Sequence, residues 1–579
     1  MTKAAPRGQG NLWTAPTAAP EPKALEELAQ AVETAEVVED PEAPEETPAV
    51  EKPPAEAAPD VPRRRTAEQM ASQQREISVS EFFTKNRHLL GFDNPRKALL
   101  TAVKEGVDNS LDACEEAGIL PEVRVAIRAV EGVEDRFVVL IEDGGPGIVP
   151  AQVPRIFGKL LYGSKFHRMK MSRGQQGIGI SAAGMYGQLT TGKPTRILSR
   201  VTRKPAYQCE LLMDTRKNEP QIVQEGPAEW DRPHGTRVEM EMEARYARGR
   251  QSVEEYLLQV SIANPHATII FEGPDGARME MPRSAKELPP EPREIKPHPQ
   301  GIELGMLIGM LQTTAAKTLA SFLHQDFSRV STPVAGDICK RAKLPENARP
   351  GRIARQEADA LYKALQDTKL MKPPTDCVVP IGQDLLLKGL KGGVEADFYH
   401  TVTRPPAVYR GNPFQVEVGL AYGGGLAANE VCRVLRFANR VPLLYQQSAC
   451  AVTRGVATTA WRNYGISQSA GQLPVGPLAV VVHIASVWVP FTSESKEAIA
   501  HYPEILKEIK LALQECGRRL GSYVRHRRRE ADAERKRQYI EKYIPHIGIA
   551  LQEILHLTNA EQEDVVMKLV DMLEKSRKM

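Results

Sequence analysis

Residues 104–113 read Lys-Glu-Gly-Val-Asp-Asn-Ser-Leu-Asp-Ala, residues 143–147 read Asp-Gly-Gly-Pro-Gly, and residues 173–180 read Arg-Gly-Gln-Gln-Gly-Ile-Gly-Ile. An acidic pair on a helix, an Asp-Gly turn and a glycine-rich turn are each common, so none of the three is specific alone. Their order and their chemistry, between Asn94 and Ser181, predict a single nucleotide pocket. The rest of the chain is interpreted outward from this stretch.

The first segment is predicted to lie on a helix that starts at Asn94-Pro95, a capping amide followed by a proline that suits a first turn. At about 100° per residue, one side of this helix is apolar and the other carries Glu105, Asn109 and Asp112. Glu105 can take a proton from an attacking water, and Asn109 can offer a neutral oxygen to Mg²⁺. A solvated polar face is the ordinary alternative for this helix taken by itself.

The second segment follows a predicted buried strand over residues 136–142, which is apolar and rich in β-branched residues. Asp143 at the strand end can accept a hydrogen bond from the exocyclic amine of a base. The glycines after it, including Gly147, let a flat ring approach the backbone. A plain Asp-Gly turn is the alternative.

The third segment has the pattern Gly-x-x-Gly-x-Gly and runs into a predicted helix start at Ser181. Backbone N–H groups at a helix N-terminus bind phosphate well. The pattern is neither the dinucleotide fingerprint nor the P-loop, which ends in Gly-Lys-Ser/Thr. It is more typical of a glycine-rich lid over a triphosphate, with a structural turn as the alternative.

The order Glu-x3-Asn, Asp-x-Gly-x-Gly and Gly-x-x-Gly-x-Gly resembles the GHKL ATPase family, which includes gyrase, Hsp90, histidine kinases and MutL. Residues 157–167 and 173–179 are similar in particular to the B-subunit family of topoisomerase VI. This resemblance covers nearly everything from about residue 76 to the end. It implies an ATP-hydrolysing subunit of a type IIB DNA topoisomerase with ATP and Mg²⁺ as cofactors.

The resemblance also implies a role for each residue of the site. Glu105 activates water, Asn109 holds Mg²⁺ and Asp143 recognises adenine. The remaining nucleotide-binding residues are expected to be Gly147, Ser164, Lys165, Arg173, Gly174, Gln175, Gln176, Gly177, Ile178, Gly179, Ile180 and Thr236.

Lys496 matches the switch-loop lysine of the family, which couples the γ-phosphate to movement of the next domain. A point charge on a flexible stem suits that task. The sequence predicts a helix that begins near Lys496, where a positive charge is slightly unfavourable against the helix dipole. This mismatch favours a functional interpretation over an ordinary surface lysine.

The expected fold class is multidomain α+β. Composition predicts a disordered tail rich in Ala, Pro and Glu (1–75). For the rest, the resemblance implies a GHKL ATPase α/β sandwich with an N-terminal strap (76–297), a helix–two-turns–helix domain (298–375), an S5-like transducer domain (376–545) and a C-terminal helical region that contacts the A subunit (546–579). Residues 377–381, 415–420, 433–439 and 479–489 are candidate strands of the transducer, and residues 505–543 a long charged helix. By pattern alone the strap is equally a helix packed on its own domain. The C-terminal region docks onto the A subunit by the resemblance, and by pattern alone it is a partner-binding or self-packing helix pair.

Composition limits the function classes. Among the 579 residues, 76 basic and 73 acidic side chains leave a net charge of +3, so DNA contact must rest on local patches rather than on a strongly basic chain. Basic runs such as residues 340–343 and 349–355 are by default solvated faces. The seven cysteines contain no Cys-x-x-Cys pair, which favours a reducing compartment without structural zinc. The apolar run 478–491 is too short to span a bilayer and is predicted to be a core strand.

The resemblance implies the remaining properties. The expected partners are the DNA-cleaving A subunit, in an A2B2 heterotetramer, a second copy of this chain when ATP binds, and double-stranded DNA, with no membrane. The expected location is the cytoplasm, associated with the nucleoid. Two alternatives stay open: another GHKL clamp ATPase of MutL or chaperone type, and a non-enzymatic scaffold with a decayed ATP pocket.

Overall fold

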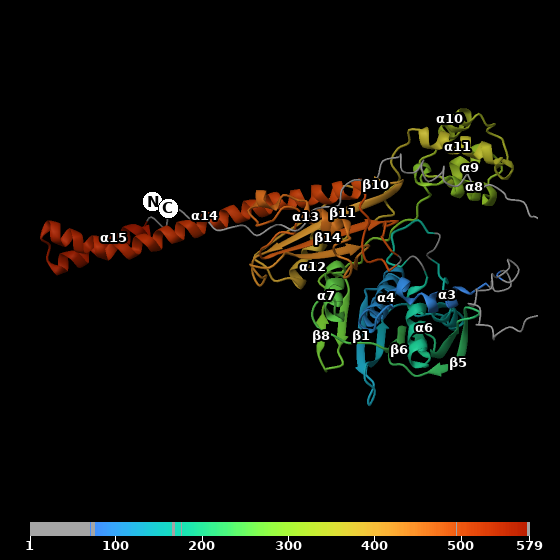
Figure 1. Cartoon of the computed structure of the whole chain (residues 1–579), viewed down its shortest axis with the longest axis horizontal. Helices are drawn as coiled ribbons and strands as arrows, with labels where there is room; N and C mark the ends of the chain where they lie inside the picture. The colour runs from blue at the N-terminus through green and yellow to red at the C-terminus, as the bar shows by residue number, and fades with distance from the viewer. Residues whose placement is uncertain (1–69, 71–75, 165–167, 175–176, 494, 576–579) are drawn as a thin grey trace, which may run out of the picture. The chain divides into compact units, whose positions relative to one another are not determined.

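The computed structural model describes residues 70, 76–164, 168–174, 177–493 and 495–575. The predicted tail, apart from Met70, and the final few residues of the chain therefore lie outside the described residues. Within them the chain forms two β-sheets, a separate group of short helices and a long C-terminal helix pair (Figure 1).

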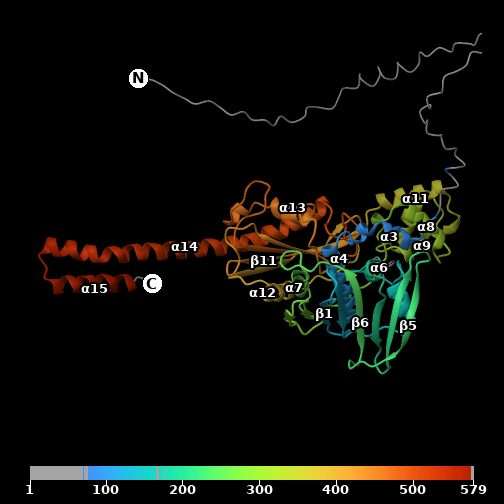
Figure 2. The same cartoon turned by 60° about the horizontal axis from the view of Figure 1, so that its bottom comes forward.

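The first sheet has eight strands in the order β5-β4-β3-β6-β2-β1-β7-β8. All pairings are antiparallel except that of β1 with β7. Its strands are β1 (Glu122–Ala129), β2 (Arg136–Asp143), β3 (Thr195–Arg200), β4 (Ala206–Asp214), β5 (Glu219–Ala228), β6 (Gly235–Glu243), β7 (Thr268–Glu272) and β8 (Arg278–Met281). The helices that pack on it are α4 (Pro95–Glu116), α5 (Val153–Gly158), α6 (Gly179–Thr191) and α7 (Val253–Ala263). These helices contact one another as well as the sheet, so the first unit is a two-layer sandwich (Figure 2).

Helix α4 forms as its sequence predicts. The Asn94 side chain accepts a hydrogen bond from the Lys97 N–H at 2.9 Å, and Pro95 occupies the first turn. Its apolar side is buried against the sheet, including Leu99, Val103 and Leu111. Since each fully buried side chain of this kind contributes roughly 1.5–3 kcal/mol, this stripe fixes which side of α4 faces away from the sheet.

The strap region contains α3 (Val79–Lys85), a short helix whose N-terminal Ser78 caps Glu81. The hydroxyls of Ser78 and Ser80 both donate to the carbonyl of Thr215, which ties α3 to the loop after β4. The helix is therefore packed on its own domain in this structure, as one of the two sequence interpretations expected.

A separate core holds the next four helices, which lie together in the yellow-green group of Figure 1. They are α8 (Leu304–Thr313), α9 (Leu319–Asp326), α10 (Thr332–Ala342) and α11 (Arg355–Asp367). Their buried residues, such as Phe322 and Leu361, pack with one another in one cluster. The helical character predicted for this block is confirmed.

The second sheet has six strands, five of them in the order β10-β11-β14-β12-β13, with β9 paired to β11. The strands are β9 (Phe398–Thr403), β10 (Ala407–Tyr409), β11 (Asn412–Tyr422), β12 (Arg433–Ala438), β13 (Val441–Pro442) and β14 (Leu478–Ser486). Alternate residues of β14 face opposite layers: Val480 and Val482 pack in the cluster with the long helix α14 (Pro503–Leu555), and Ala479 and Val481 pack in the cluster with α12 (Gln383–Gly393). Helix α13 (Ala451–Ala457) lies against α14.

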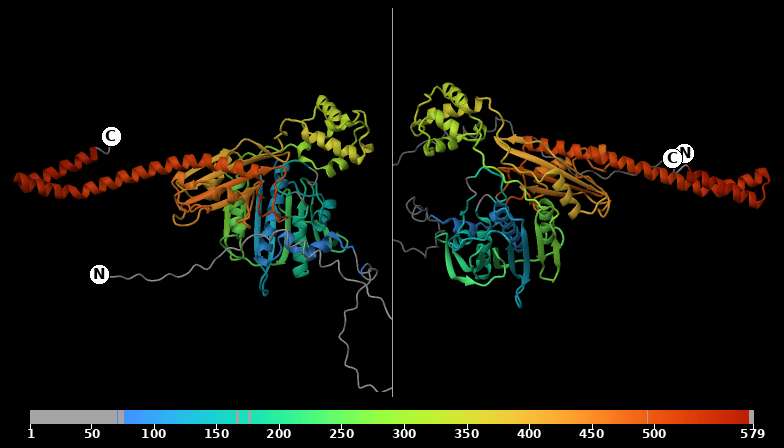
Figure 3. Two further views of the ribbon diagram at one scale, coloured as in Figure 1. Left: turned by 45° about the horizontal axis from the view of Figure 1, so that its top comes forward. Right: turned by 180° about the vertical axis from the view of Figure 1, so that it is seen from behind.

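The C-terminal region is an antiparallel helix pair. Helix α14 ends at Leu555 and α15 (Asn559–Lys575) returns along it, as all views of Figures 1 and 3 show. The predicted long helix is therefore confirmed and is longer than residues 505–543. Among the described residues, no helix is both long enough and apolar enough to cross a bilayer.

Three local predictions are wrong. Residues 377–381 are not a strand: their backbone groups pair with single partners, such as the Met171 N–H, which donates to the Cys377 carbonyl. No helix begins near Lys496, which has a φ of +53° in a loop, and the next helix starts at Pro503. The argument from an unfavourable helix dipole at Lys496 therefore does not hold. Strands β1, β5, β8, β9, β10 and β13 were not predicted: β8, β10 and β13 have four residues or fewer, and β5 is largely polar and exposed.

Candidate active site

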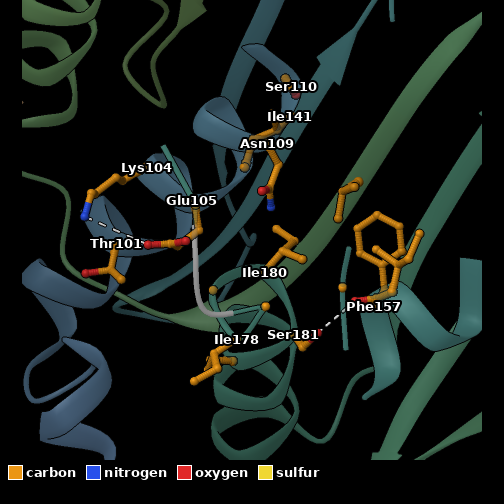
Figure 4. A pocket seen from close by; sticks show the side chains of 18 of the residues that line it. Thr101, Lys104, Glu105, Asn109, Ser110, Ile141, Phe157, Ile178, Ile180 and Ser181 are labelled. Atoms are coloured by element: carbon orange, nitrogen blue, oxygen red, sulfur yellow. Dashed lines mark hydrogen bonds and ion pairs between the residues drawn. The ribbon is translucent and has the colours of Figure 1, made fainter. Parts of the chain in front are cut away.

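A cavity with a volume of about 660 Å³ lies beside α4. It is lined by α4, the end of β2, the start of α6, and a group of residues around β13 and Lys496 from the second sheet's unit. Figure 4 shows Glu105 and Asn109 on one helix, with Ile178, Ile180 and Ser181 on the segment that faces it. The volume falls within the range of about 300–1,000 Å³ that small-molecule sites commonly have.

Asp143 forms one end of the cavity and is buried. Its two carboxylate oxygens accept hydrogen bonds at 2.9 Å from the Ser110 hydroxyl and the Gly145 N–H. Burial raises the pKa of Asp143, although these two donors counteract the shift. Thr236 pairs with Asp143 across β6 and β2, so it lies at this end of the cavity. The two hydrogen bonds hold the carboxylate in one position at this end of the cavity.

The backbone conformation and the close packing at residue 147, near this carboxylate, require a glycine. Its φ is +75°, and a Cβ there would lie 2.1 Å from the carbonyl oxygen of Arg200. No other residue fits this position without moving the chain. The turn of residues 143–147 is held in addition by His234, whose Nδ1 lies 2.8 Å from the Gly145 carbonyl oxygen.

Glu105 and Asn109 project from the outward side of α4 into the cavity. The Lys104 ammonium lies 3.9 Å from Glu105 Oε1, a contact that Figure 4 draws as a dashed line. The Asn109 amide is exposed to the cavity and makes no hydrogen bond to any described residue. Its oxygen thus has no hydrogen-bond donor among the described residues and can serve as a ligand.

The start of α6 faces these two side chains. Residues 177–182 line the cavity, and the side chain of the N-cap residue, Ile178, makes no capping hydrogen bond. Backbone N–H groups of a first helical turn have no partner within the helix, so they are available to a ligand there. Gly179, the first residue of α6, lies so close to Glu105 that a Cβ on it would sit 1.7 Å from Oε2. The missing side chain at Gly179 is what allows the Glu105 carboxylate to reach its position.

Arg173 has a different position from the one expected. It does not line the main cavity. Its buried guanidinium donates to Asp112 at 2.7 Å and to Glu115 at 2.6 Å, both on α4, and to Asn264 after α7. Burial alone would raise the pKa of Glu115, but Arg173 and His266 outweigh it and hold that pKa well below its ordinary value. Arg173 thus anchors the start of the glycine-rich segment to α4.

Lys496 reaches the cavity from the loop that follows β14. Burial lowers the pKa of Lys496, and the Glu105 carboxylate counteracts the shift. Asp108, next to Asn109 on α4, lines a small neighbouring cavity together with Lys496 and accepts a hydrogen bond from the Tyr256 hydroxyl. Burial raises the pKa of Asp108 to about 7, so near neutral pH the local charge depends on its protonation.

The structure brings most of the expected site residues together around one cavity. Those that line it are Glu105, Asn109, Asp143, Gly147, Ser164, Gly174, Gly177, Ile178, Gly179, Ile180, Thr236 and Lys496. Lys165, Gln175 and Gln176 lie outside the described residues.

Some lining residues were not predicted. Ser110 belongs to the first motif, but the sequence analysis assigned it no role. Its position directly after Asn109 is the one signal that could have placed it near Asp143 at the end of β2. Leu443, Tyr445 and Glu497 line the cavity from the second sheet's unit, and no local pattern distinguishes them.

If Glu105 activates water for ATP hydrolysis, as the sequence resemblance implies, we expect Gly179→Ala to lower ATP turnover by about 100-fold with little loss of ATP binding. The added methyl would displace the Glu105 carboxylate, and a misplacement of about 1 Å can cost that much in rate. The backbone N–H of residue 179 would remain. Steady-state phosphate release and an ATP titration measure the two effects. Gly226→Ala on β5, where a Cβ meets no atom within 4 Å, is the control. Unchanged turnover in Gly179→Ala would show that Glu105 does not need this position.

Comparisons with known proteins agree with this geometry. Residues 94–244 match the model of the histidine kinase-, DNA gyrase B- and HSP90-like ATPase family, and residues 373–536 match the transducer of the topoisomerase VI B subunit. The type 2 DNA topoisomerase 6 B subunit of Archaeoglobus fulgidus is 48% identical over 510 residues, which cover 88% of this chain and 84% of the relative. That of Pyrococcus horikoshii is 37% identical over 541 residues, covering 84% and 93%.

Among solved structures, the B subunit of the DNA gyrase from Myxococcus xanthus aligns with a TM-score of 0.38 and 13% identity, over 76% of this chain and 95% of that one. This likeness is too distant to add to the assignment. The matches to the curated relatives extend over both sheets and the helices between them. The chain belongs to the family of type 2 DNA topoisomerase 6 B subunits.

Proposed function

We propose that this chain is the ATP-binding and ATP-hydrolysing subunit of a type IIB DNA topoisomerase. The observation that carries the proposal is one cavity in which Glu105, Asn109 and Asp143 of the first sheet's unit meet Lys496 of the second. A nucleotide bound there contacts both units at once, so its hydrolysis changes the contacts of both.

The residues present fit ATP. The buried Asp143 carboxylate suits the adenine amine, and the uncapped N-terminus of α6 suits phosphate oxygens. Asn109 would hold Mg²⁺ through its amide oxygen, since Mg²⁺ takes few protein ligands and keeps phosphate and water in its shell. When bound, Mg²⁺ supplies positive charge that neutralises the phosphates.

The chain's own residues then divide the work of hydrolysis. Asp143 fixes the base, and the α6 N–H groups orient the phosphates. Glu105 accepts a proton from the attacking water, and the Lys496 ammonium stabilises the charge that develops on the γ-phosphate. When that phosphate leaves, Lys496 loses its partner and the second unit is released from the first.

This cycle would allow two copies of the chain to close around DNA and to open again, as a clamp does. In the proposed assembly, residues 76–297 form the ATPase domain, 298–375 the helix–two-turns–helix domain, 376–545 the transducer and 546–579 a region that contacts the A subunit. ATP binding joins two copies of the chain around double-stranded DNA in an A2B2 heterotetramer. Exposed apolar side chains on the C-terminal helix pair, among them Ile554 and Met567, support a protein partner there. The proposed location of this topoisomerase is the cytoplasm, at the nucleoid.

We expect Lys496→Ala to slow ATP hydrolysis by at least about tenfold and to uncouple hydrolysis from strand passage, because the variant lacks the charge that faces the γ-phosphate. Phosphate release and relaxation of supercoiled DNA, measured on the same preparation with the A subunit, give the two rates. Normal strand passage in this variant would remove Lys496 from the switch role. Lys507→Ala, a lysine on α14 that does not line the cavity, is the control.

Purification from native cells under mild conditions tests the proposed assembly. The expected result is a stoichiometric second subunit with a winged-helix tyrosine and an acidic metal-binding domain. A mismatch-repair or chaperone-type client in its place would assign the same ATP pocket to a different clamp. A chain that binds no ATP in a titration would instead be a scaffold, an outcome that the presence of Glu105, Asn109 and Asp143 around one cavity argues against.

A further inference from the structure

The loop that carries Lys496 is held to helix α4 by a buried ion pair. We call residues 490–493 and 495–500 the switch loop. Glu497 of this loop places Oε1 2.7 Å from the Lys97 ammonium of α4, and the two side chains are only 8% and 14% exposed. The same ammonium lies 2.9 Å from Asp93 and 5.5 Å from the centre of the Tyr445 ring. A charge this enclosed is held in one place.

The base of the switch loop is fixed to the second sheet's unit. The buried Arg436 of β12 donates to the carbonyls of Leu443 and Tyr445, both at 2.7 Å, and more weakly to that of Glu497. Within the loop, the Thr492 N–H donates to the Ala498 carbonyl at 2.9 Å. The loop therefore moves with the second unit, and its ion pair to Lys97 crosses to the first.

Helix α4 connects this ion pair to the chemistry. Lys97 precedes Glu105 by eight residues, which at 1.5 Å per residue is about 12 Å along one helix. Lys496 directly precedes Glu497, so their Cα atoms are about 3.8 Å apart. Helix α4 therefore carries the proposed general base, Glu105, and through Lys97 it also binds Glu497, the residue next to Lys496.

We infer that Lys97 and Glu497 are positioning residues for ATP hydrolysis: their ion pair holds Lys496 in the cavity at a fixed distance from Glu105. This inference rests on the proposed role of Lys496. Neither residue contacts the phosphate in this account; each acts through the placement of Lys496.

The charges of the pair are secure near neutral pH. Burial by itself would lower the pKa of Lys97, but the carboxylates of Glu497 and Asp93 outweigh it and raise that pKa. The ammonium faces Asp93 on its own helix start, Glu497 on the switch loop and the ring of Tyr445. The charges of this contact therefore do not change with pH near neutrality.

The test compares Lys97→Met, Glu497→Gln and Lys97→Arg in the complex with the A subunit. Lys97→Met and Glu497→Gln are expected to lower the kcat of ATP hydrolysis by about tenfold with the KM for ATP changed less than about twofold, since the base and phosphate contacts remain. Lys97→Arg keeps the charge and is expected to restore most of the rate. Asp93→Asn removes the other partner of Lys97, which is not on the switch loop, and is the matched control with nearly normal kcat.

The decisive measurement repeats Lys97→Met in the Lys496→Ala background. If the pair acts only through Lys496, the added substitution changes kcat by less than about twofold there. Effects that multiply in the double variant, or an equal loss of kcat in Asp93→Asn, would overturn the inference. If Lys496→Ala alone leaves turnover unchanged, the proposed switch role itself fails. A different outcome refutes only the positioning role: slow turnover in Lys496→Ala together with normal turnover in Lys97→Met.

Discussion

Glu105→Gln is expected to abolish ATP turnover and to leave ATP binding nearly intact. The amide keeps the size and hydrogen-bonding reach of the side chain but cannot accept the proton of the attacking water. General-base catalysis commonly contributes about 10²–10⁴-fold, so turnover should fall by at least about 100-fold. Glu105 lines the cavity beside the N-terminus of α6, where the terminal phosphate is proposed to lie.

Two assays check this expectation. Phosphate release measures turnover, and an equilibrium titration with ATP measures binding. Glu134→Gln, an exposed residue between β1 and β2, is the control for the same chemical change away from the cavity. Turnover that stays within about threefold of the unchanged chain would exclude Glu105 as the general base.

Asp143→Asn is expected to weaken ATP binding by roughly 100-fold. Both carboxylate oxygens already accept hydrogen bonds, from Ser110 and Gly145, and an amide would turn its NH₂ group toward one of these donors. The base amine would also lose a charged acceptor. Hydrogen bonds to charged groups are worth about 1.5–3 kcal/mol each, which corresponds to about 10–150-fold in affinity.

The measurement is a pair of titrations, with ATP and with GTP. The unchanged chain should prefer ATP strongly, and the variant should lose most of this preference together with its affinity. Asp231→Asn, an exposed aspartate in the loop before β6, is the control. An Asp143→Asn chain that binds ATP as tightly as before would contradict the assignment of Asp143 to the base.

Much of the ATPase unit could be predicted because its signals are local. The cap at Asn94, the stripe of apolar residues on α4 and the strand that ends at Asp143 each follow from neighbours in the sequence, and the structure confirms all three. The order of the three motifs then predicted that Glu105, Asn109 and Asp143 share a cavity, as they do.

The remaining features depend on partners far away in the chain. The run 377–381 is apolar and buried, as predicted, but its backbone bonds go to separate segments rather than to a neighbouring strand. Lys496 was placed on a helix because the residues after it suit one. The switch loop instead forms a hydrogen bond within itself and an ion pair with Lys97, about 400 residues earlier in the chain. No local sequence pattern encodes such a contact.

Arg173 illustrates the same limit within the motif. An arginine beside a glycine-rich loop suggests a phosphate ligand, yet its partners are Asp112 and Glu115, two acids on the outward and lateral sides of α4. The sequence shows both acids, but only the fold shows that they enclose the guanidinium.

The most direct test of the central claim is relaxation of supercoiled plasmid DNA by this chain with the A subunit purified alongside it. The account predicts relaxation with ATP, none without it, and none when the chain carries Glu105→Gln. Relaxation that proceeds equally without ATP, or ATP hydrolysis that never changes DNA topology, would contradict the claim that this cavity drives strand passage.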